Sequence, residues 1–319
     1  MKNRKLVALT TLACASLLAS CGAPPPPAAT GPAKPRMALV LKTLNSPFFI
    51  EMQNGAKAAA DKLGIDLVVQ AAEREVDVEK QMQIVENLIQ TGIKVLLITP
   101  SGSREIVPVL AKANAANIPI VIIDTRIDPA AATAANVKTA SFIGSDNYEG
   151  GKAAGTELVA IASGKANVAI LEGIPGHETG DSRLKGFKEA TKASPGIKVV
   201  ASQTANWERD QGFTVFQNML QAHPEIDAVF ACNDMMALGA LEAIAAANKT
   251  GKIRMIGFDA VDDARKAIKE GKMVASVAQF PGDMGRMAVE TAAKLIKGEA
   301  VETDQRVRIE LIKKTEGVK

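Results

Sequence analysis

Residues 37–69 read MALVLKTLNSPFFIEMQNGAKAAADKLGIDLVV. The apolar run at 37–41 is typical of a buried strand, and Ser46-Pro47 then offers an N-cap residue followed by a proline at the first helical position. Apolar residues next recur at helical spacing, at Met52, Ala56, Ala59 and Leu63. The β-branched run at 65–69 follows at once. This stretch therefore predicts a strand, a helix and a second, parallel strand.

The same alternation of short apolar runs and amphipathic segments continues along the chain. Further strands are expected at 94–98, 118–123, 141–143, 166–171, 197–200, 226–232, 253–258, 274–278 and 307–311. About ten or eleven strands exceed what one ordinary parallel sheet of this type holds, so they are better divided between two sheets of five or six strands each. The predicted fold class is α/β, with two doubly wound parallel-sheet lobes.

The first 35 residues lie before this pattern and carry a processing signal. A basic start is followed by an apolar stretch at 6–18 that is shorter than the roughly 20 residues of a membrane-spanning helix. We therefore interpret residues 1–20 as a signal peptide. Small residues precede Cys21, as in the bacterial lipobox, so we expect Cys21 to carry a lipid anchor. Residues 21–35 are rich in proline and predict an extended tether. The expected location is outside the cytoplasm, on the periplasmic or outer face of a bacterial membrane.

Composition excludes several kinds of partner. The formal charge of +3 is spread along the chain without basic runs, so no nucleic-acid partner is expected. The chain has two histidines, which makes a His-rich metal site improbable, and we predict no metal and no cofactor. Cys232 is the one thiol that the folded body keeps, and it ends an apolar run. We interpret it as a small buried hydrophobic residue and not as a nucleophile.

Polar side chains follow several of the expected strands. In open α/β sheets ligands bind beyond the carboxyl ends of the strands, and the side chains found there are Lys42, Asp124, Asn233, Asp259 and Gln279. Arg183 lies near the start of a helix at this edge, Trp207 in a loop, and Phe48 and Phe49 at the start of the first helix. Aromatic faces with carboxylates, amides and an arginine are what a sugar needs, because its C–H faces stack on rings while its hydroxyls form charge-assisted hydrogen bonds.

Each of these residues also has a simpler structural interpretation. Phe48 and Phe49 are equally suited to the core, and Lys42 to a solvated strand end. Asp234 and Asp146 are equally suited to capping helices. Arg183 alone is more often a surface charge. The functional hypothesis depends on their joint placement at one edge.

Five motifs resemble one known family, the ribose- and allose-binding proteins, which are solute receptors of ABC importers with the type I periplasmic binding protein fold. They are TLNSPFF at 43–49, SDN at 145–147, ACNDMMALG at 231–239, GFD at 257–259 and AQ at 278–279. The resemblance covers residues 36–311. It implies lobes at 36–144 plus 280–306 and at 145–279 plus 307–319, joined by a three-segment hinge near 144–146, 279–281 and 306–308.

Carried over by motif, the resemblance implies a set of sugar contacts, namely Lys42, Phe48, Phe49, Asp124, Arg183, Trp207, Asn233, Asp259 and Gln279. The chain has Asp124-Thr125 where ribose receptors have an Asp-Arg pair, and Lys42 where they have serine. Lys42 and Trp207 look more like the allose receptors. The implied ligand is a monosaccharide, with an allose-like hexose or related sugar ranked above ribose. The implied partner is an ABC transporter permease, and we expect a monomer.

The same residues also bear on rival functions. The sequence has no nucleophile elbow, phosphate loop or metal cluster, and Asp262-Asp263 are placed where a helix begins, so we predict that the chain is not an enzyme. A transcription regulator of this fold needs a DNA-reading helix pair before the first strand, where this chain has the signal peptide and prolines. A receptor for autoinducer-2 or a polyol, or a chemotaxis sugar receptor, stays open.

Overall fold

The computed structural model describes residues 34–314. The predicted signal peptide, the lipid anchor at Cys21 and most of the proline-rich tether lie outside the described residues. Within residues 34–314, no helix has the length and the apolar character needed to cross a membrane.

The first sheet has six strands, all parallel, in the order β11-β5-β4-β3-β1-β2. Their bounds are β1 (Arg36–Leu41), β2 (Asp66–Ala71), β3 (Leu96–Ile98), β4 (Ile120–Ile123), β5 (Ser141–Ser145) and β11 (Asp304–Val307). The helices packed on this sheet are α1 (Pro47–Leu63), α2 (Val78–Gln90), α3 (Val107–Ala115) and α10 (Pro281–Ile296), and the short α4 (Pro129–Ala134) follows β4 without burying a residue.

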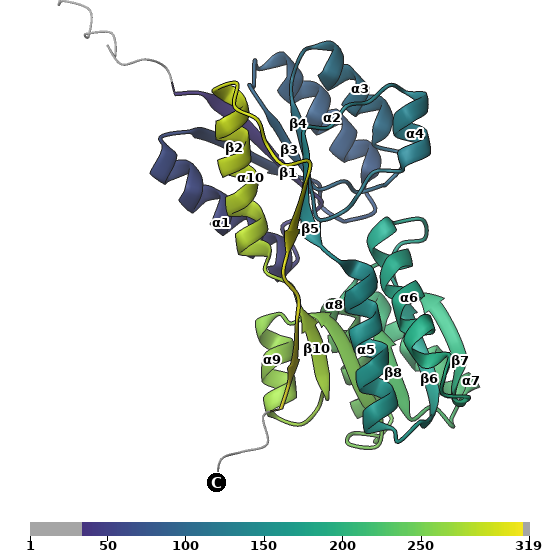
Figure 1. Ribbon diagram of the computed structural model, residues 1–319. Coiled ribbons are helices and arrows are strands. Elements are labelled where there is room, and N and C mark those ends of the chain that lie inside the picture. The colour runs from purple at the N-terminus through teal and green to yellow at the C-terminus, as the bar shows by residue number, and fades with distance from the viewer. Residues whose placement is uncertain (1–33, 315–319) are drawn as a thin grey trace, which may run out of the picture. The chain divides into compact units, whose positions relative to one another are not determined.

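Strand β1 shows why this sheet is covered on both faces. Its side chains alternate, so that Met37, Leu39 and Leu41 join a buried cluster with α1 and α10, while Ala38 and Val40 join a second cluster with α2 and α3. Figure 1 shows these two pairs of helices on opposite faces of the sheet. An uninterrupted apolar strand between two helical layers is what the doubly wound fold requires.

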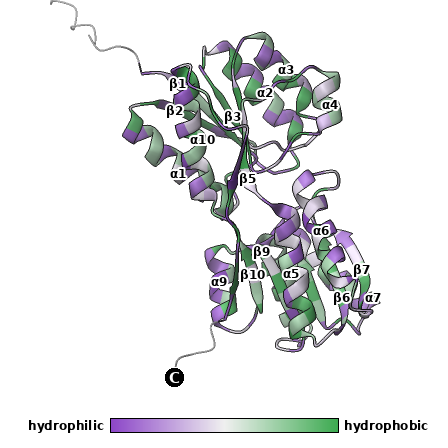
Figure 2. Ribbon diagram, in the orientation of Figure 1, coloured by the Kyte–Doolittle hydropathy of each residue, from purple (hydrophilic) through white to green (hydrophobic). Residues whose placement is uncertain are grey.

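The second sheet has the order β12-β10-β9-β8-β6-β7. Its strands are β6 (Lys165–Glu172), β7 (Gly196–Thr204), β8 (Ala228–Ala231), β9 (Arg254–Asp259), β10 (Ala275–Ala278) and β12 (Glu310–Lys313). Its helices are α5 (Asn147–Ile161), α6 (Glu178–Thr191), α7 (Arg209–Ala222), α8 (Asp234–Ala246) and α9 (Asp262–Lys269). Figure 2 shows hydrophobic strands covered by helices with mixed faces. The prediction of two α/β lobes is confirmed.

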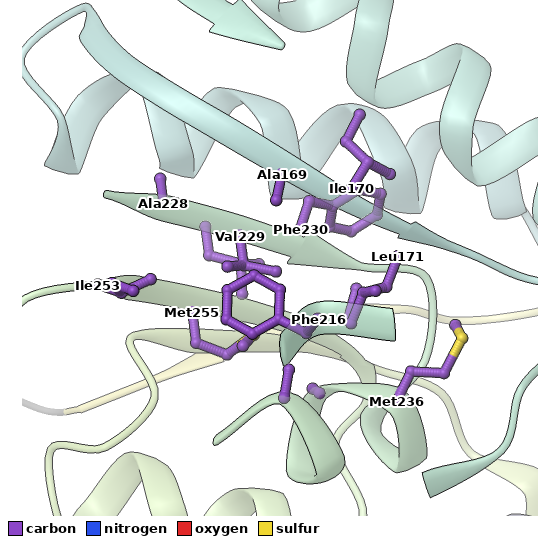
Figure 3. Packing of buried hydrophobic residues seen from close by; sticks show 14 of the residues in the cluster. Ala169, Ile170, Leu171, Phe216, Ala228, Val229, Phe230, Met236, Ile253 and Met255 are labelled. Atoms are coloured by element: carbon purple, nitrogen blue, oxygen red, sulfur yellow. The ribbon is translucent and has the colours of Figure 1, made fainter. Parts of the chain in front are cut away.

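The core of the second sheet is built on its central strands. Phe230 of β8 stacks on Phe187 of α6, with ring centroids 4.5 Å apart. On the other face, Phe216 of α7 lies against the strands that carry Val229 and Met255 (Figure 3). Cys232 is fully buried in the same cluster, as expected.

The chain passes between the two sheets three times. It leaves the first sheet after β5, returns after β10, and leaves again between β11 and β12. As a result β5 and β11 lie side by side at one edge of the first sheet (Figure 1). Ser145 is in register with Val307. The crossings coincide with the three segments expected from the sequence, whereas the exact lobe boundaries stay a prediction.

Three expectations about these elements are wrong. The single strand expected at 307–311 is in fact the end of β11 and the start of β12, so the described residues form twelve strands. Apolar residues alternate with polar ones at Val307, Ile309 and Leu311, across the crossing between the two sheets. The sequence pattern therefore gives no sign that one strand ends and another begins there. In addition, β12 runs antiparallel to β10. Leu63, expected on the buried face of α1, is 45% exposed because it ends the helix.

Each crossing helix packs against a helix of the sheet that it enters. Helix α5 lies on α6 and α10 lies on α1. The contact is close enough that a Cβ at Gly151 of α5 would collide with the carbonyl oxygen of Arg183, and one at Gly285 of α10 with that of Met52. Backbone contact at glycine therefore sets the position of Arg183, at the edge where the polar side chains gather.

Candidate ligand-binding site

A pocket opens at the carboxyl ends of the strands of both sheets, with about 310 Å³ of empty space, part of it open to solvent. The cavity that water-sized molecules can occupy within it is about 30 Å³, far below the ~300–1,000 Å³ typical of small-molecule sites. Its lining residues are Lys42, Ser46, Phe48, Phe49, Glu75, Asp124, Thr179, Arg183, Trp207, Asn233, Asp259 and Gln279. All nine residues expected from the sequence are among them. Whether each one contacts a ligand stays a prediction.

Lys42, at the end of β1, is buried instead of solvated, so its interpretation as a plain strand end is wrong. Its Nζ lies 3.5 Å from Glu75 Oε2 and 3.9 Å from Asp124 Oδ2. It also lies 5.9 Å from the centroid of the Phe49 ring. The lysine is therefore a buried cation shared by two carboxylates.

Asp124 follows β4 in a left-handed backbone conformation, with φ of 62°. Its backbone N–H donates to the carbonyl of Ile143 on the neighbouring strand at 2.8 Å, and its Oδ2 accepts from the Thr125 hydroxyl at 2.9 Å. Aspartate tolerates this conformation better than most residues. The turn directs a carboxylate into the pocket directly beyond the strand end.

Arg183 of α6 is held from several directions and is not a surface charge. Its Nε donates to Asn147 Oδ1 at 2.8 Å, and its Nη1 donates to the carbonyl of Cys232 at 2.7 Å. Nη1 also lies 3.7 Å from Asp259 Oδ1, and the guanidinium carbon lies 3.8 Å from the centroid of the Phe258 ring. A planar fork fixed in this way presents its free N–H groups to the pocket without further ordering.

Asp259 ends β9, and its Oδ1 accepts from Gln279 Nε2 at 2.8 Å. Burial raises the pKa of this carboxyl to about 6, while Arg183 and Gln279 act in the opposite direction. The Oε1 of Gln279 is buried with no hydrogen-bond partner in residues 34–314. An orphaned acceptor at a pocket wall is costly until a donor reaches it, and a ligand hydroxyl is such a donor.

Trp207 forms a wall of the pocket from the loop after β7, with φ of 68°. Its indole packs over Gly173, where a Cβ would collide with the ring. Its Nε1 donates to His177 Nδ1 at 3.4 Å, and its carbonyl accepts from Asn233 Nδ2 at 3.1 Å. Burial lowers the pKa of His177 to about 3, so this ring is neutral and can accept the bond. The indole is thereby fixed by the hydrogen bond from its Nε1 and by the hydrogen bond to the backbone carbonyl of Trp207.

Phe48 and Phe49 are both core residues and pocket-lining residues, so each of the two interpretations applies to them. The rings pack edge to face with centroids 5.2 Å apart, and both belong to the core cluster under the first sheet. Both also line the pocket. They are core residues whose outer faces are available to a ligand.

One of the two helix-capping predictions is confirmed and the other is wrong. Asp146 caps α5 by accepting from the Glu149 N–H at 3.1 Å, as predicted. Asp234 does not cap α8, because the side chain of Asn233 accepts the Met236 N–H there. Asp234 is instead fully buried, and it accepts from the N–H of Val261, which holds the loop after Asp259. Burial raises the pKa of Asp234 well above its usual value.

Three lining residues were not predicted as ligand contacts. Ser46 was identified only as an N-cap, and Thr179 stands in the first turn of α6. Glu75 lies in the polar loop after β2, four residues beyond the strand end, where no pattern marks it. The signal that could have found it is topological: β2 is the neighbour of β1, so the loop after β2 comes close to Lys42. Burial raises the pKa of Glu75 to about 7, with Lys42 opposing it.

The chemistry available in this pocket is recognition by hydrogen bonds, charge and stacking. Within residues 34–314 no group of three His, Cys, Asp or Glu side chains is arranged to hold a metal ion. Burial raises the pKa of the Cys232 thiol to about 12, which removes it as a nucleophile at neutral pH.

Comparisons with known proteins agree with this geometry. A family model described as a periplasmic binding protein domain matches residues 37–300. The chain is 41% identical to the ribose import binding protein of Escherichia coli K12 over 88% of its own length and 92% of the relative. It is 36% identical to a D-ribose/D-allose-binding protein of Pseudomonas aeruginosa over 95% and 94%.

A solved structure carries the same fold with a ligand in place. A periplasmic solute-binding protein of an ABC transporter from Actinobacillus succinogenes 130z, with bound D-allose, superposes with a TM-score of 0.82 at 38% identity, over 88% of this chain and 98% of that chain. These relatives and neighbours are solute-binding proteins, which confirms the prediction that the chain is not an enzyme.

Proposed function

The chain belongs to the periplasmic binding protein domain family, and on that premise we propose that it captures a neutral monosaccharide and presents it to the permease of an ABC transporter. The observation that carries the proposal is the joint placement of two cations, three carboxylates, two amides and three aromatic rings in one small pocket. The nine residues expected from the sequence are the proposed contacts.

The proposed binding mode follows from what each side chain has left to offer. Sugar hydroxyls donate to Asp124 and Asp259 and accept from Arg183, and such bonds to charged groups are the stronger kind. The C–H face of the ring stacks on the Trp207 indole. A sugar hydroxyl that donates to Gln279 Oε1 supplies the hydrogen bond that this buried oxygen lacks within residues 34–314. A pocket that meets all of these requirements favours a compact ligand with hydroxyls on several sides.

An allose-like hexose or related sugar remains our first choice over ribose. Lys42 and Trp207 support it, as does Thr125 where ribose receptors have arginine. The neighbour with bound D-allose and the relative named for both sugars are consistent with it. A polyol or autoinducer-2 ligand, or a chemotaxis role, is the alternative; the fixed fork of Arg183 favours a sugar over autoinducer-2.

Calorimetry with a panel of pentoses, hexoses and polyols tests the proposal. We expect D-allose or a related hexose to bind at least tenfold more tightly than D-ribose, which corresponds to about 1.4 kcal/mol. Tight binding of ribose alone would contradict the ranking, and no heat with any neutral sugar would contradict the function.

Anchoring at Cys21 is a separate part of the proposal, supported by the small residues before Cys21 and by the prolines after it. A Cys21→Ser variant should lose labelling by fatty acid and leave the membrane fraction. Cys232→Ser is the matched control, because that thiol is buried in the core. Unchanged labelling of the Cys21 variant would exclude the anchor. The chain is expected to act as a monomer.

A further inference from the structure

The pocket holds one more carboxylate than it holds cations. Its carboxylates are Glu75, Asp124 and Asp259, and its cations are Lys42 and Arg183. Each of these side chains is less than a tenth exposed. An unbalanced buried charge is unfavourable, so one negative charge must be offset when the pocket is occupied. Either a proton or a cation on the ligand can offset it.

Glu75 is the carboxylate with the least compensation. Asp259 has Gln279 and Arg183, and Asp124 has Thr125 and Lys42. Within the described part of the chain, the one cationic group within 4 Å of Glu75 is Lys42, which Asp124 shares. No hydrogen bond from residues 34–314 reaches the Glu75 side chain. Its oxygens are therefore available to a ligand.

The other charged groups around Glu75 add to this imbalance. Burial, together with the carboxylates of Asp124, Asp259 and Glu208, raises its pKa to about 7 against the opposing effect of Lys42. Glu208 stands before α7 and is itself paired with Arg74, at 3.4 Å. His177 is neutral and contributes no positive charge. A ligand that displaces water from the pocket removes the remaining solvation of the Glu75 charge.

We propose that Glu75 is a further ligand-binding and specificity-determining residue, which binds a hydroxyl of a neutral sugar or polyol as a carboxylic acid, so that the pocket takes up one proton from solvent as the ligand binds. This inference rests on the proposed function. A carboxylic acid donates one hydrogen bond and still accepts, whereas a carboxylate only accepts. The same arrangement discriminates against sugar acids, whose carboxylate adds another negative charge.

The linkage has a defined direction. A group whose pKa is higher in the complex than in the free protein favours binding at low pH, so affinity should fall as pH rises and should level off above the pKa in the complex. Because the pKa of Glu75 is about 7 before a ligand binds, we expect the affinity for D-allose to change little below pH 6. It should fall by up to about tenfold per pH unit above pH 7, until the pH exceeds the pKa in the complex.

Isothermal titration calorimetry of the purified protein with D-allose tests this, at pH 8 in buffers of different ionisation enthalpy. We expect the heat to depend on the buffer, with an uptake of roughly half a proton or more. Glu75→Gln keeps the shape of the side chain without its titration, and it should reduce the uptake and flatten the pH profile. Glu73→Gln, an exposed neighbour in the same loop, should change neither.

The outcomes separate this inference from the proposed function. Binding of a neutral sugar with heats that do not depend on the buffer overturns the role of Glu75 alone, as does unchanged uptake in Glu75→Gln. Tighter binding of D-allosamine or D-glucosamine than of the neutral sugars, without proton uptake, also overturns it, because the ligand's ammonium then offsets the charge. If no neutral sugar binds the unmodified protein at any pH, the proposed function itself has failed.

Discussion

The two sheets place an acid and a cation at corresponding positions. In the first sheet Lys42 follows the first strand and Asp124 follows the fourth; in the second sheet Arg183 lies on the helix after the first strand and Asp259 ends the fourth. The two N–O distances are 3.9 Å and 3.7 Å, and both aspartates have positive φ, 62° and 106°. A doubly wound unit has thus produced the same kind of ion pair twice, each at the carboxyl edge of its sheet.

The difference lies in how the cations are held. Arg183 is fixed by Asn147 and by the carbonyl of Cys232, and it stacks on Phe258. Lys42 is paired with two carboxylates, at 3.5 Å and 3.9 Å, and lies 5.9 Å from the Phe49 ring, on a flexible stem. We therefore expect the Arg183 pair to supply affinity for any sugar, and the Lys42 pair to distinguish one sugar from another.

The largest effect is expected for Arg183→Ala. Loss of hydrogen bonds to a charged donor should weaken binding of the preferred sugar by about 1.5–3 kcal/mol, or roughly ten- to more than a hundredfold. Calorimetry measures this directly. Arg183→Lys, which keeps the charge without the fork, should recover only part of the affinity. Normal binding by Arg183→Ala would contradict the expectation that the Arg183 pair supplies affinity and the Lys42 pair selectivity.

Asp259→Asn tests whether burial of the Asp259 charge, in its pair with Arg183, destabilises the folded protein. Because the pKa of Asp259 is about 6 when folded, above its ordinary 3.8, its contribution to stability is complete below about pH 4 and is lost as pH rises through 6. At pH 7.5 the variant should therefore gain about 2–3 kcal/mol in free energy of unfolding, although it should bind sugar more weakly.

The measurement for Asp259→Asn is denaturant unfolding of the ligand-free protein at pH 4 and pH 7.5. The gain should vanish at pH 4, where the aspartate is protonated as well. Asp262→Asn, at the exposed start of α9, is the matched control. A variant that is less stable than the original at pH 7.5 would show that the Arg183 pair outweighs the burial of Asp259.

Lys42→Ser tests the selectivity of the first pair and should have a smaller effect. The variant introduces the residue of the ribose receptors and leaves Glu75 and Asp124 without their shared cation. We expect affinity for D-allose to fall about tenfold, or about 1.4 kcal/mol, and the ratio of ribose to allose binding to rise. Lys62→Ser on the exposed end of α1 is the control. An equal loss for every sugar would contradict a selective role.

The smallest effect concerns the single tryptophan. A sugar that stacks on Trp207 replaces water at the indole, so emission should change on binding without background from other tryptophans. His177→Ala should alter the emission of the free protein, since it removes the acceptor of the indole N–H. Emission that does not respond to a sugar shown to bind by calorimetry would exclude Trp207 from the contact surface.

The sequence alone predicts that several of the pocket residues converge, because a simple rule applies to them. Lys42, Asp124, Asp259 and Gln279 follow strands directly, and parallel strands bring their carboxyl ends to one edge, so their convergence needs no knowledge of packing. Arg183 and Trp207 were placed near this edge by the helix and the loop that carry them, and the resemblance to a known family added their role as sugar contacts. The fold class followed from apolar periodicity, which is strong when strands are buried on both faces.

Three features were not predicted from the sequence, and each has a physical reason. They are the place of Glu75 in the pocket, the capping of α8 by Asn233, and the division between β11 and β12. The position of Glu75 depends on how a loop returns across a neighbouring strand, which local sequence does not encode. Asn233 and Asp234 are adjacent and chemically equivalent as caps, and only the burial of Asp234 near Val261 separates them. At 307–311 an unbroken alternation of apolar residues continues across a change of sheet.

The packing of α10 on α1 also determines when the first lobe can be completed. Helix α1 ends at Leu63, and the helix that covers it begins at Pro281, after the whole second sheet except β12. At the usual ~5–20 residues per second of synthesis, the apolar side of α1 waits roughly ten to forty seconds for its cover. Until then the leading half of the nascent chain lacks a finished core. The first lobe of a chain with this connectivity therefore cannot complete its core until late in synthesis.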